Sequence, residues 1–383
     1  MAKRLFTNCN IAIVEAAMMQ GCRFFCGYPL TPTTEALEHA SRRFPETGRV
    51  FVQAESELSA ISMLGGAAAV GERGMTATSG VGFALMQEGL SNLAGMAQFP
   101  TVIYLAQRGG PGMGRLYPNQ GDYRIATRGG GAGDYRCIVL GPETVQEAVD
   151  LTKLAFVLAD RYRTPAILLA DQMLAGTTTS YALGDPLPEE PVQKDYILEG
   201  ARGRIGRYVG RPGYTNPKEP NYLSMVTPNL LGMDEDPDGY SYERHMLDLF
   251  EKYARIEASE VRAEQDRVED AELVIVAYGS SALLMRPVVE QARARGLKVG
   301  LIRPITLFPF PKQLLNDTAG RVRDFLVVEM SFGQMADDVR LAVLDRGARV
   351  HDFQTHGGAI PRPERVLPVV ETLLEQAVQR RAG

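Results

Sequence analysis

The first half of the chain alternates short apolar runs with segments of helical periodicity. Several of the apolar runs are broken by Gly, Pro or Thr and are followed by a segment in which apolar residues recur every three or four positions. The predicted strands are 22–28, 49–54, 74–80, 101–107, 137–141 and 166–170, and the predicted helices are 9–20, 31–44, 56–72, 82–97 and 143–162. Such alternation is typical of a parallel sheet with helices on both faces. We therefore predict an α/β domain over residues 1–185.

A proline-rich stretch separates this domain from a second, smaller one. Eight prolines fall between Asp185 and Tyr240, a density that disfavours regular elements and predicts an irregular inter-domain arm over residues 186–265. A second α/β unit is predicted over residues 266–383. Its strands are expected at 272–280, 298–311 and 324–331, and its helices at 281–296 and 333–347.

Composition and charge narrow the function classes. The net charge is −5 and the Lys and Arg residues are scattered, so nothing favours nucleic acid or an anionic membrane as partner. No run approaches the ~18 apolar residues of a spanning helix, and the N-terminus does not resemble a signal peptide, so we expect a cytoplasmic protein. Because the cysteines form no C-x-x-C pair, we expect buried thiols and no metal site in this chain. They are Cys9, Cys22, Cys26 and Cys137.

Residues that can carry chemistry follow several predicted strands at the point where each ends. Glu55 and Glu57 follow the second strand, Ser79-Gly80 ends the third, and Arg108 follows the fourth. The carboxyl ends of parallel strands meet at one edge of a sheet, where α/β proteins bind their ligands. An acid, a hydroxyl and a guanidinium converging there would suit a ligand with both a basic nitrogen and a carboxylate.

Longer motifs in the same order resemble a known family. GYPLTPTTEALEHA (27–40), AESELSAISMLGGAAAVGERGMTATSG (54–80), YLAQRGGPGMG (104–114) and NQGDYRIATRGGGAGDYRCIVLG (119–141) resemble the alpha chain of 2-oxoacid:ferredoxin oxidoreductases. Among these, the branched-chain 2-oxoacid (2-oxoisovalerate) members are the most similar. VIVAYGSSA and GLIRPITLFPFP, in the second half, resemble the family's transketolase-C-like domain. The resemblance implies a thiamine-pyrimidine-binding domain followed by a smaller transketolase-C-like domain.

The resemblance also implies three catalytic residues. Glu57 matches the glutamate that bonds the aminopyrimidine ring of thiamine diphosphate and drives its tautomer shift. Thr31 and Arg108 match the residues that hold the 2-oxoacid, the arginine through its planar fork. Residue chemistry alone leaves an alternative for each. Glu55 could be the ring acid, Thr31 could be only a helix cap, and Arg108 could pair with a structural carboxylate.

Further site residues are expected around these three. Arg115 could shape the pocket for the substrate side chain. The segment Ser79-Gly80 could contact the cofactor or form only a tight turn. The residues expected to contact the cofactor besides Glu57 are Tyr28, Pro29, Ser79 and Gly80.

Several parts that the implied reaction needs are missing from the sequence. No Gly-Asp-Gly with a downstream Asn, the usual diphosphate and Mg²⁺ motif of thiamine enzymes, is present, and the cysteines do not suit iron–sulfur clusters. The resemblance and these absences together imply a beta subunit with a diphosphate-binding domain and Mg²⁺. They also imply gamma-type and ferredoxin-like subunits that carry clusters, with ferredoxin as acceptor.

The implied reaction is oxidative decarboxylation of a 2-oxoacid to CO₂ and acyl-CoA, with coenzyme A as co-substrate. Specificity for 2-oxoglutarate or for an aromatic 2-oxoacid such as phenylglyoxylate or an aryl pyruvate stays open. A non-catalytic scaffold with a thiamine fold is one rival hypothesis, which the retained acid, threonine and arginine disfavour. A transketolase or a lipoamide-dependent dehydrogenase chain is another, which YPLTP and RGGP disfavour.

Overall fold

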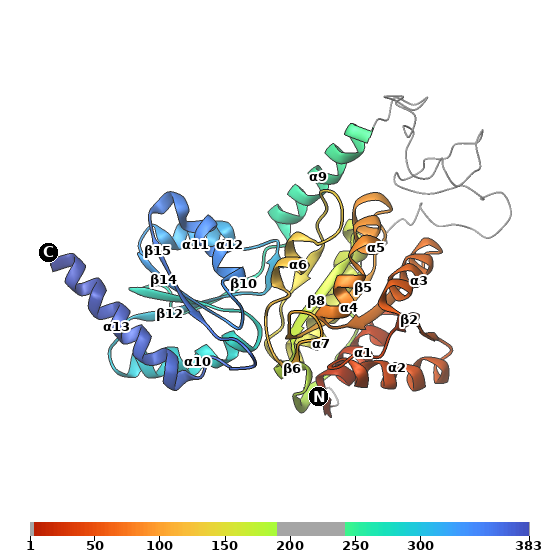
Figure 1. Ribbon diagram of the computed structural model, residues 1–383, viewed down its shortest axis with the longest axis horizontal. Helices are drawn as coiled ribbons and strands as arrows, with labels where there is room; N and C mark the ends of the chain where they lie inside the picture. Colours follow the sequence, from red (N-terminus) through yellow and green to blue (C-terminus); the bar gives the residue numbers. More distant parts are fainter. Residues whose placement is uncertain (1–3, 190–241, 383) are drawn as a thin grey trace.

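The computed structural model describes residues 4–189 and 242–382. The strands of its larger sheet are β2 (Phe24–Gly27), β3 (Val50–Gln53), β4 (Gly74–Thr78), β5 (Val102–Gly109), β6 (Arg115–Pro118), β7 (Ile138–Leu140), β8 (Ala166–Asp171) and β13 (Thr306–Phe308). They lie in the order β13-β7-β8-β5-β4-β2-β3, with β6 paired to β5 (Figure 1). The pairs from β7 to β3 are parallel, whereas β13 and β6 are antiparallel to their neighbours. The predicted parallel sheet is confirmed.

Helices cover both faces of this sheet. They are α1 (Cys9–Met19), α2 (Thr34–Glu46), α3 (Glu57–Ala69), α4 (Gly80–Leu85), α5 (Gln87–Ser91), α6 (Tyr123–Arg128), α7 (Val145–Tyr162) and α8 (Gln172–Ala175). Helix α1 packs between α2 and α7 on one face, and α3 packs with α4 and α5 on the other (Figure 1). Beside them, β1 (Arg4–Asn8) pairs antiparallel with β9 (Thr178–Ala182). The sheet is therefore enclosed, and ligands can approach it at the strand ends.

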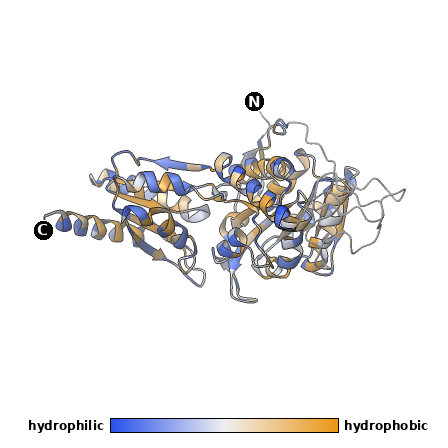
Figure 2. Cartoon of the chain, turned by 90° about the horizontal axis from the view of Figure 1, so that it is seen from above, coloured by the Kyte–Doolittle hydropathy of each residue, from blue (hydrophilic) through white to orange (hydrophobic). Residues whose placement is uncertain are grey.

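The second half of the chain forms a smaller α/β unit. Its strands are β10 (Ala263–Asp266), β11 (Leu273–Val276), β12 (Val299–Pro304), β14 (Asp324–Glu329) and β15 (Arg349–Gln354), and its helices are α10 (Gly279–Ala294), α11 (Lys312–Ala319), α12 (Gln334–Val343) and α13 (Pro363–Ala382). The sheet order is β10-β12-β11-β14-β15, and only β10 is antiparallel. Figure 2 shows hydrophobic residues gathered in the strands of both sheets. The second predicted α/β unit is confirmed.

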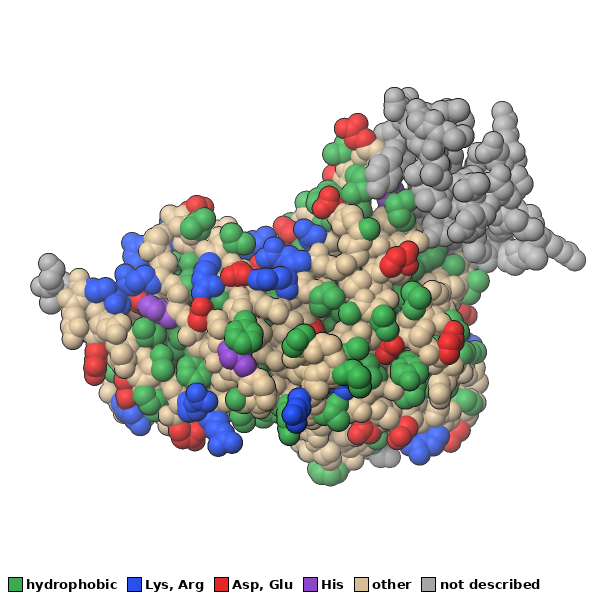
Figure 3. Space-filling model, in the orientation of Figure 1, with side chains coloured by type: hydrophobic (Ala, Val, Ile, Leu, Met, Phe, Trp, Pro, Cys, Tyr) green, Lys and Arg blue, Asp and Glu red, His purple; other side chains and the backbone are tan. Residues whose placement is uncertain are grey.

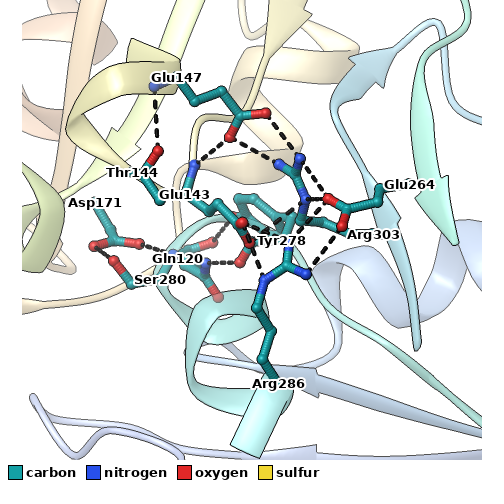
Figure 4. A network of polar contacts seen from close by, with 10 residues as sticks. All are labelled: Gln120, Glu143, Thr144, Glu147, Asp171, Glu264, Tyr278, Ser280, Arg286 and Arg303. Carbon is teal, nitrogen blue, oxygen red and sulfur yellow. Dashed lines mark hydrogen bonds and ion pairs between the residues drawn. The ribbon is translucent and has the colours of Figure 1, made fainter. Parts of the chain in front are cut away.

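The two units are joined by a strand and by a cluster of charges. Strand β13 of the second half extends the first sheet beside β7. Arg303, which is 4% exposed, forms ion pairs with Glu147 of the first unit at 2.8 Å and with Glu264 at 3.0 Å. Arg286 bridges the units in the same way, between Glu143 and Glu264 (Figure 4). Because Arg303 is buried, separating the units would leave its charge desolvated and unpaired, so this cluster helps to hold the units together.

The prediction of an irregular, proline-rich arm over residues 186–265 is partly wrong. Within residues 186–265 the structure describes a helix, α9 (Tyr242–Ser259), and strand β10. The prediction of irregular chain is therefore wrong for these two elements. The eight prolines on which the prediction is based all precede residue 240, so none of them interrupts the helix. Residues 190–241 lie outside the described residues, and the proposed domain limits stay a prediction.

Two further findings concern membranes and thiols. Within residues 4–189 and 242–382, every helix is too short or too polar to cross a bilayer. All four cysteines are buried and free, and burial raises their thiol pKa values, to about 12 for Cys22, Cys26 and Cys137. The expected buried thiols are confirmed.

Candidate active site

Four neighbouring strands end at the same edge of the first sheet. Strands β5, β4, β2 and β3 lie side by side and run parallel, so the segments that follow them start together. Glu57 opens the helix after β3, Ser79 and Gly80 follow β4, and Arg108 is the penultimate residue of β5. The structure thus places the acid, the hydroxyl and the guanidinium at one edge, as the sequence predicts.

Glu57 is the first residue of α3 and is buried, with 5% of its surface exposed. The preceding Ser56 caps the helix by accepting a hydrogen bond from the N–H of Ser59 at 3.3 Å. The Glu57 carboxyl lies against the first turn of α4, where a Cβ added to Gly82 would come within 2.3 Å of its Oε1 atom. Within the described part of the chain, this carboxyl has no hydrogen bond or ion pair. A buried acid without a protein partner is a candidate ligand contact.

The space around Gly82 is too small for a side chain. An added Cβ would also lie 2.3 Å from Oγ1 of Thr78, so Gly82→Ala should displace both polar groups. Displacing the Glu57 carboxyl would move it away from a ligand, and overpacking of this kind costs about 1–3 kcal/mol. For thiamine diphosphate, the cofactor that the sequence resemblance implies, we therefore expect roughly tenfold weaker binding, measured by calorimetry. Gly66→Ala is the matched control, since a Cβ at that helical position meets nothing within 4 Å. Equal binding by both variants would mean that Gly82 does not position Glu57.

A second group of buried polar atoms surrounds the start of α4. Arg108 is 8% exposed, and its Nε atom, the Ser79 hydroxyl and Oδ2 of Asp122 have no hydrogen-bond partner among the described residues. A Cβ added to Gly80 would come within 2.4 Å of both Asp122 oxygens. Glu57 and Asp122 therefore approach the same short helix at Gly82 and at Gly80. Several unsatisfied polar atoms in one buried place indicate a site that a ligand completes.

Asp122 is a site residue that the sequence did not reveal. Burial raises the pKa of its carboxyl to about 7, and the positive charge of Arg108 opposes that rise. In the sequence, Asp122 lies in the motif NQGDYR, where no feature distinguishes it from a surface aspartate. Its position at Gly80 depends on the path of the chain after β6, which periodicity does not predict.

Hydrogen bonds connect the smaller unit to the strand end that carries Arg108. Gln107, next to Arg108, accepts a hydrogen bond from the N–H of Asp122 at 3.2 Å and donates one to the Tyr278 hydroxyl at 3.4 Å. Gln120 donates to the Tyr278 carbonyl at 2.9 Å. Asp171 at the end of β8 accepts a 2.6 Å hydrogen bond from the Ser280 hydroxyl (Figure 4). The start of α10 thus supports the strand end that carries Arg108.

The remaining predicted residues lie at the rim. Thr31 is exposed in the loop between β2 and α2, and Tyr28 in the same loop is 40% exposed. Thr31 does not cap the helix; the capping position is Thr33, whose hydroxyl instead donates to the Leu30 carbonyl. Arg115 is exposed on β6. Arg115 pairs with Gly109, the residue after Arg108. No hydrogen bond or ion pair joins the side chains of Thr31 or Arg115 to Glu57 or Arg108 among the described residues, so their roles stay predictions, as does that of Pro29.

Apolar side chains are exposed around the same edge. Figure 3 shows hydrophobic groups spread over the visible face of the larger unit. Several large apolar side chains near the site residues in sequence are exposed, and another is exposed on the loop of the second unit that adjoins them. They are Tyr28, Leu58, Leu85, Met113, Leu116, Tyr117 and Phe332. Met113 and Phe332 are 83% and 77% exposed. Exposed apolar residues beside a site are compatible with a surface that binds another protein.

Two family models match the chain. The first, described as pyruvate flavodoxin/ferredoxin oxidoreductase, thiamine diP-bdg, matches residues 15–255. The second, described as pyruvate:ferredoxin oxidoreductase core domain II, matches residues 271–366. Together they span both units of the structure.

Named relatives and a solved structure agree with these models. The ketoisovalerate oxidoreductase subunit VorB of Methanothermobacter thermautotrophicus is 47% identical over 87% of this chain and 88% of its own. The 2-oxoglutarate synthase subunit KorA of Methanocaldococcus jannaschii is 34% identical over 94% and 97%. The structure of 2-oxoglutarate:ferredoxin oxidoreductase from Magnetococcus marinus, with 2-oxoglutarate, coenzyme A and succinyl-CoA bound, matches with a TM-score of 0.80 and 28% identity. That match covers 97% of this chain and 65% of the other.

Proposed function

Because the chain belongs to the pyruvate flavodoxin/ferredoxin oxidoreductase family, we propose that it is the subunit that binds the pyrimidine end of thiamine diphosphate in a 2-oxoacid oxidoreductase. The family expected from YPLTP, the Glu57 segment and RGGP is confirmed. The reaction is oxidative decarboxylation of a 2-oxoacid to CO₂ and acyl-CoA, with coenzyme A as co-substrate.

This proposal rests on the burial of Glu57 and on the absence of a described protein partner for its carboxyl. Glu57 is 5% exposed at the strand-end edge, and no hydrogen bond or ion pair joins its carboxyl to another described residue. A carboxylic acid kept in this way fits a ring nitrogen of an aminopyrimidine, to which it can donate a hydrogen bond. Thiamine diphosphate, when bound, supplies the carbon nucleophile that attacks the oxo group. Glu57 would hold and move the proton on its pyrimidine ring, and Tyr28, Pro29, Ser79 and Gly80 would contact the cofactor.

Arg108 would bind the substrate carboxylate. Arg108 is 8% exposed, its Nε atom is buried without a partner, and no hydrogen bond or ion pair of its guanidinium is found within the described residues, which supports a role in holding an anionic ligand. A planar fork of donors matches a carboxylate with two parallel hydrogen bonds. Thr31, on the neighbouring loop, would make a second substrate contact, and Arg115 would lie near the substrate side chain.

The proposed substrate is 2-oxoisovalerate or another branched-chain 2-oxoacid. Its support is the higher identity to the relatives named ketoisovalerate oxidoreductase subunits than to those named 2-oxoglutarate synthase subunits.

Partner subunits would complete the enzyme. We expect a beta subunit that binds the diphosphate and Mg²⁺, and gamma-type and ferredoxin-like subunits that carry iron–sulfur clusters and pass electrons to ferredoxin. The exposed apolar residues around the site, including Met113 and Phe332, support a large protein contact there. The cytoplasm is the proposed location.

The test is turnover by the complex purified through this chain. Methyl viologen reduction with coenzyme A would be followed for 2-oxoisovalerate, 2-oxoglutarate and phenylglyoxylate. We expect reduction with the highest kcat/KM for 2-oxoisovalerate. A preference for 2-oxoglutarate would overturn the substrate but keep the reaction. No turnover of any 2-oxoacid by a complex that contains thiamine diphosphate and clusters would favour a non-catalytic scaffold.

A further inference from the structure

Arg108 and Asp122 bring opposite charges into the same buried corner without pairing. Asp122 is tied to the end of β5 because its N–H donates to Gln107, the residue before Arg108. Oδ2 of Asp122 is buried, and no hydrogen bond or ion pair joins it to the Arg108 guanidinium. Arg108 nevertheless acts on Asp122 electrostatically. A buried arginine without an ion pair among the described residues is available to an anionic ligand.

Among residues 4–189 and 242–382, the other charged or titratable groups near Asp122 are the following. Tyr278, at the start of α10, feels the Asp122 charge and hydrogen-bonds to Gln107. Glu57 on α3 lies across the first turn of α4, against Gly82 rather than Gly80. Arg124, two residues after Asp122, is exposed and pairs with Asp337 on α12. Arg108 is therefore the cation through which the charge of Asp122 would be felt.

We propose that Asp122 is a positioning residue that controls, through its own charge, how strongly Arg108 holds the carboxylate of the 2-oxoacid. This inference rests on the proposed function of Arg108. With Asp122 neutral, the full charge of Arg108 attracts the substrate. With Asp122 ionised, its negative charge competes for Arg108 and repels the substrate carboxylate.

The direction of the pH effect follows from the buried position of Asp122. Its pKa is raised to about 7, so the carboxyl becomes ionised as the pH rises through neutrality. Substrate affinity should therefore fall over that range. Two unit charges several ångströms apart in a partly buried site interact by about 1–2 kcal/mol or more, so the KM for the 2-oxoacid should rise at least about fivefold.

The experiment measures the KM for 2-oxoisovalerate between about pH 6 and about pH 8 in the whole complex. Asp122→Asn keeps the shape of the side chain and removes its charge. We expect the variant to have a KM at about pH 8 that is lower than that of the wild type by roughly fivefold, and that no longer rises with pH. The matched control is Asp134→Asn, at an exposed aspartate of the same chain, which should keep the wild-type profile.

A second measurement needs no variant, and so does not depend on the folding of Asp122→Asn. In the wild type, the inhibition constant of a competing carboxylate analogue should rise with pH, whereas that of the neutral 2-oxoisovaleramide should not. If Asp122→Asn keeps the wild-type pH dependence, or if the amide weakens in parallel with the acid, the inference on Asp122 is overturned. Failure of the proposed function would look different, because the wild-type complex would then oxidise no 2-oxoacid at any pH.

Discussion

Replacing Glu57 with glutamine should lower kcat for 2-oxoacid oxidation by about a thousandfold, because acid–base catalysis of this kind contributes about 10²–10⁴ in rate. Glutamine fills the same space beside Gly82 and Thr78, so packing of the α3 and α4 helices should be kept. It cannot exchange a proton with the pyrimidine ring, which is the role proposed for the acid. The measurement is methyl viologen reduction by the assembled complex, with thiamine diphosphate occupancy determined in parallel.

Glu55→Gln is the matched control for this prediction. Glu55 is the other acid that the sequence allowed for the role, but its side chain is exposed and accepts a hydrogen bond from Ser59 within α3. That hydrogen bond lowers the pKa of Glu55, which is the behaviour of a solvated helix-end acid rather than of a proton relay. We expect near wild-type activity from Glu55→Gln. The opposite ranking of the two variants would reassign the ring acid to Glu55.

The strand-end residues could be predicted because they depend on local patterns. Apolar runs located β2 to β5, and the parallel arrangement then required that Glu57, Ser79 and Arg108 share one edge. The family resemblance selected Glu57 over Glu55, and the burial of Glu57 in the structure agrees with that choice. Periodicity alone gave neither the burial nor the ranking.

The partners of these residues could not be predicted, because they come from distant parts of the chain. Asp122 meets Gly80 across more than forty positions, and Tyr278 meets Gln107 across 171. The hairpin strand β6 and the strand β13, which crosses into the first sheet, are too short and too dependent on tertiary contacts to show in a pattern. The prolines up to Pro237 predict irregular chain, and that prediction extends too far along the sequence, over α9, which begins after them.

Through its contact with the larger unit, the smaller unit supports the candidate active site. Gln107, Gln120 and Tyr278 form a continuous buried set of hydrogen bonds that ends one residue from Arg108. With the ion pairs of Arg303, this set makes the smaller unit part of the support for the site. Substitutions in this supporting set could displace the Arg108 side chain, and a displacement of about 1 Å is enough to slow catalysis.

Arg108→Lys should raise the KM for 2-oxoisovalerate by about a hundredfold, because losing a buried, charge-assisted contact costs about 2–5 kcal/mol. Lysine keeps the positive charge but not the planar fork, and its compact ammonium group cannot form two parallel hydrogen bonds to a carboxylate. Because Arg108 is 8% exposed and has no protein partner among the described residues, little of the loss should come from broken protein contacts. Arg124→Lys, at an exposed ion pair with Asp337, is the control and should leave KM unchanged. A loss of kcat with unchanged KM in Arg108→Lys would place the residue near the reacting atoms but not on the substrate carboxylate.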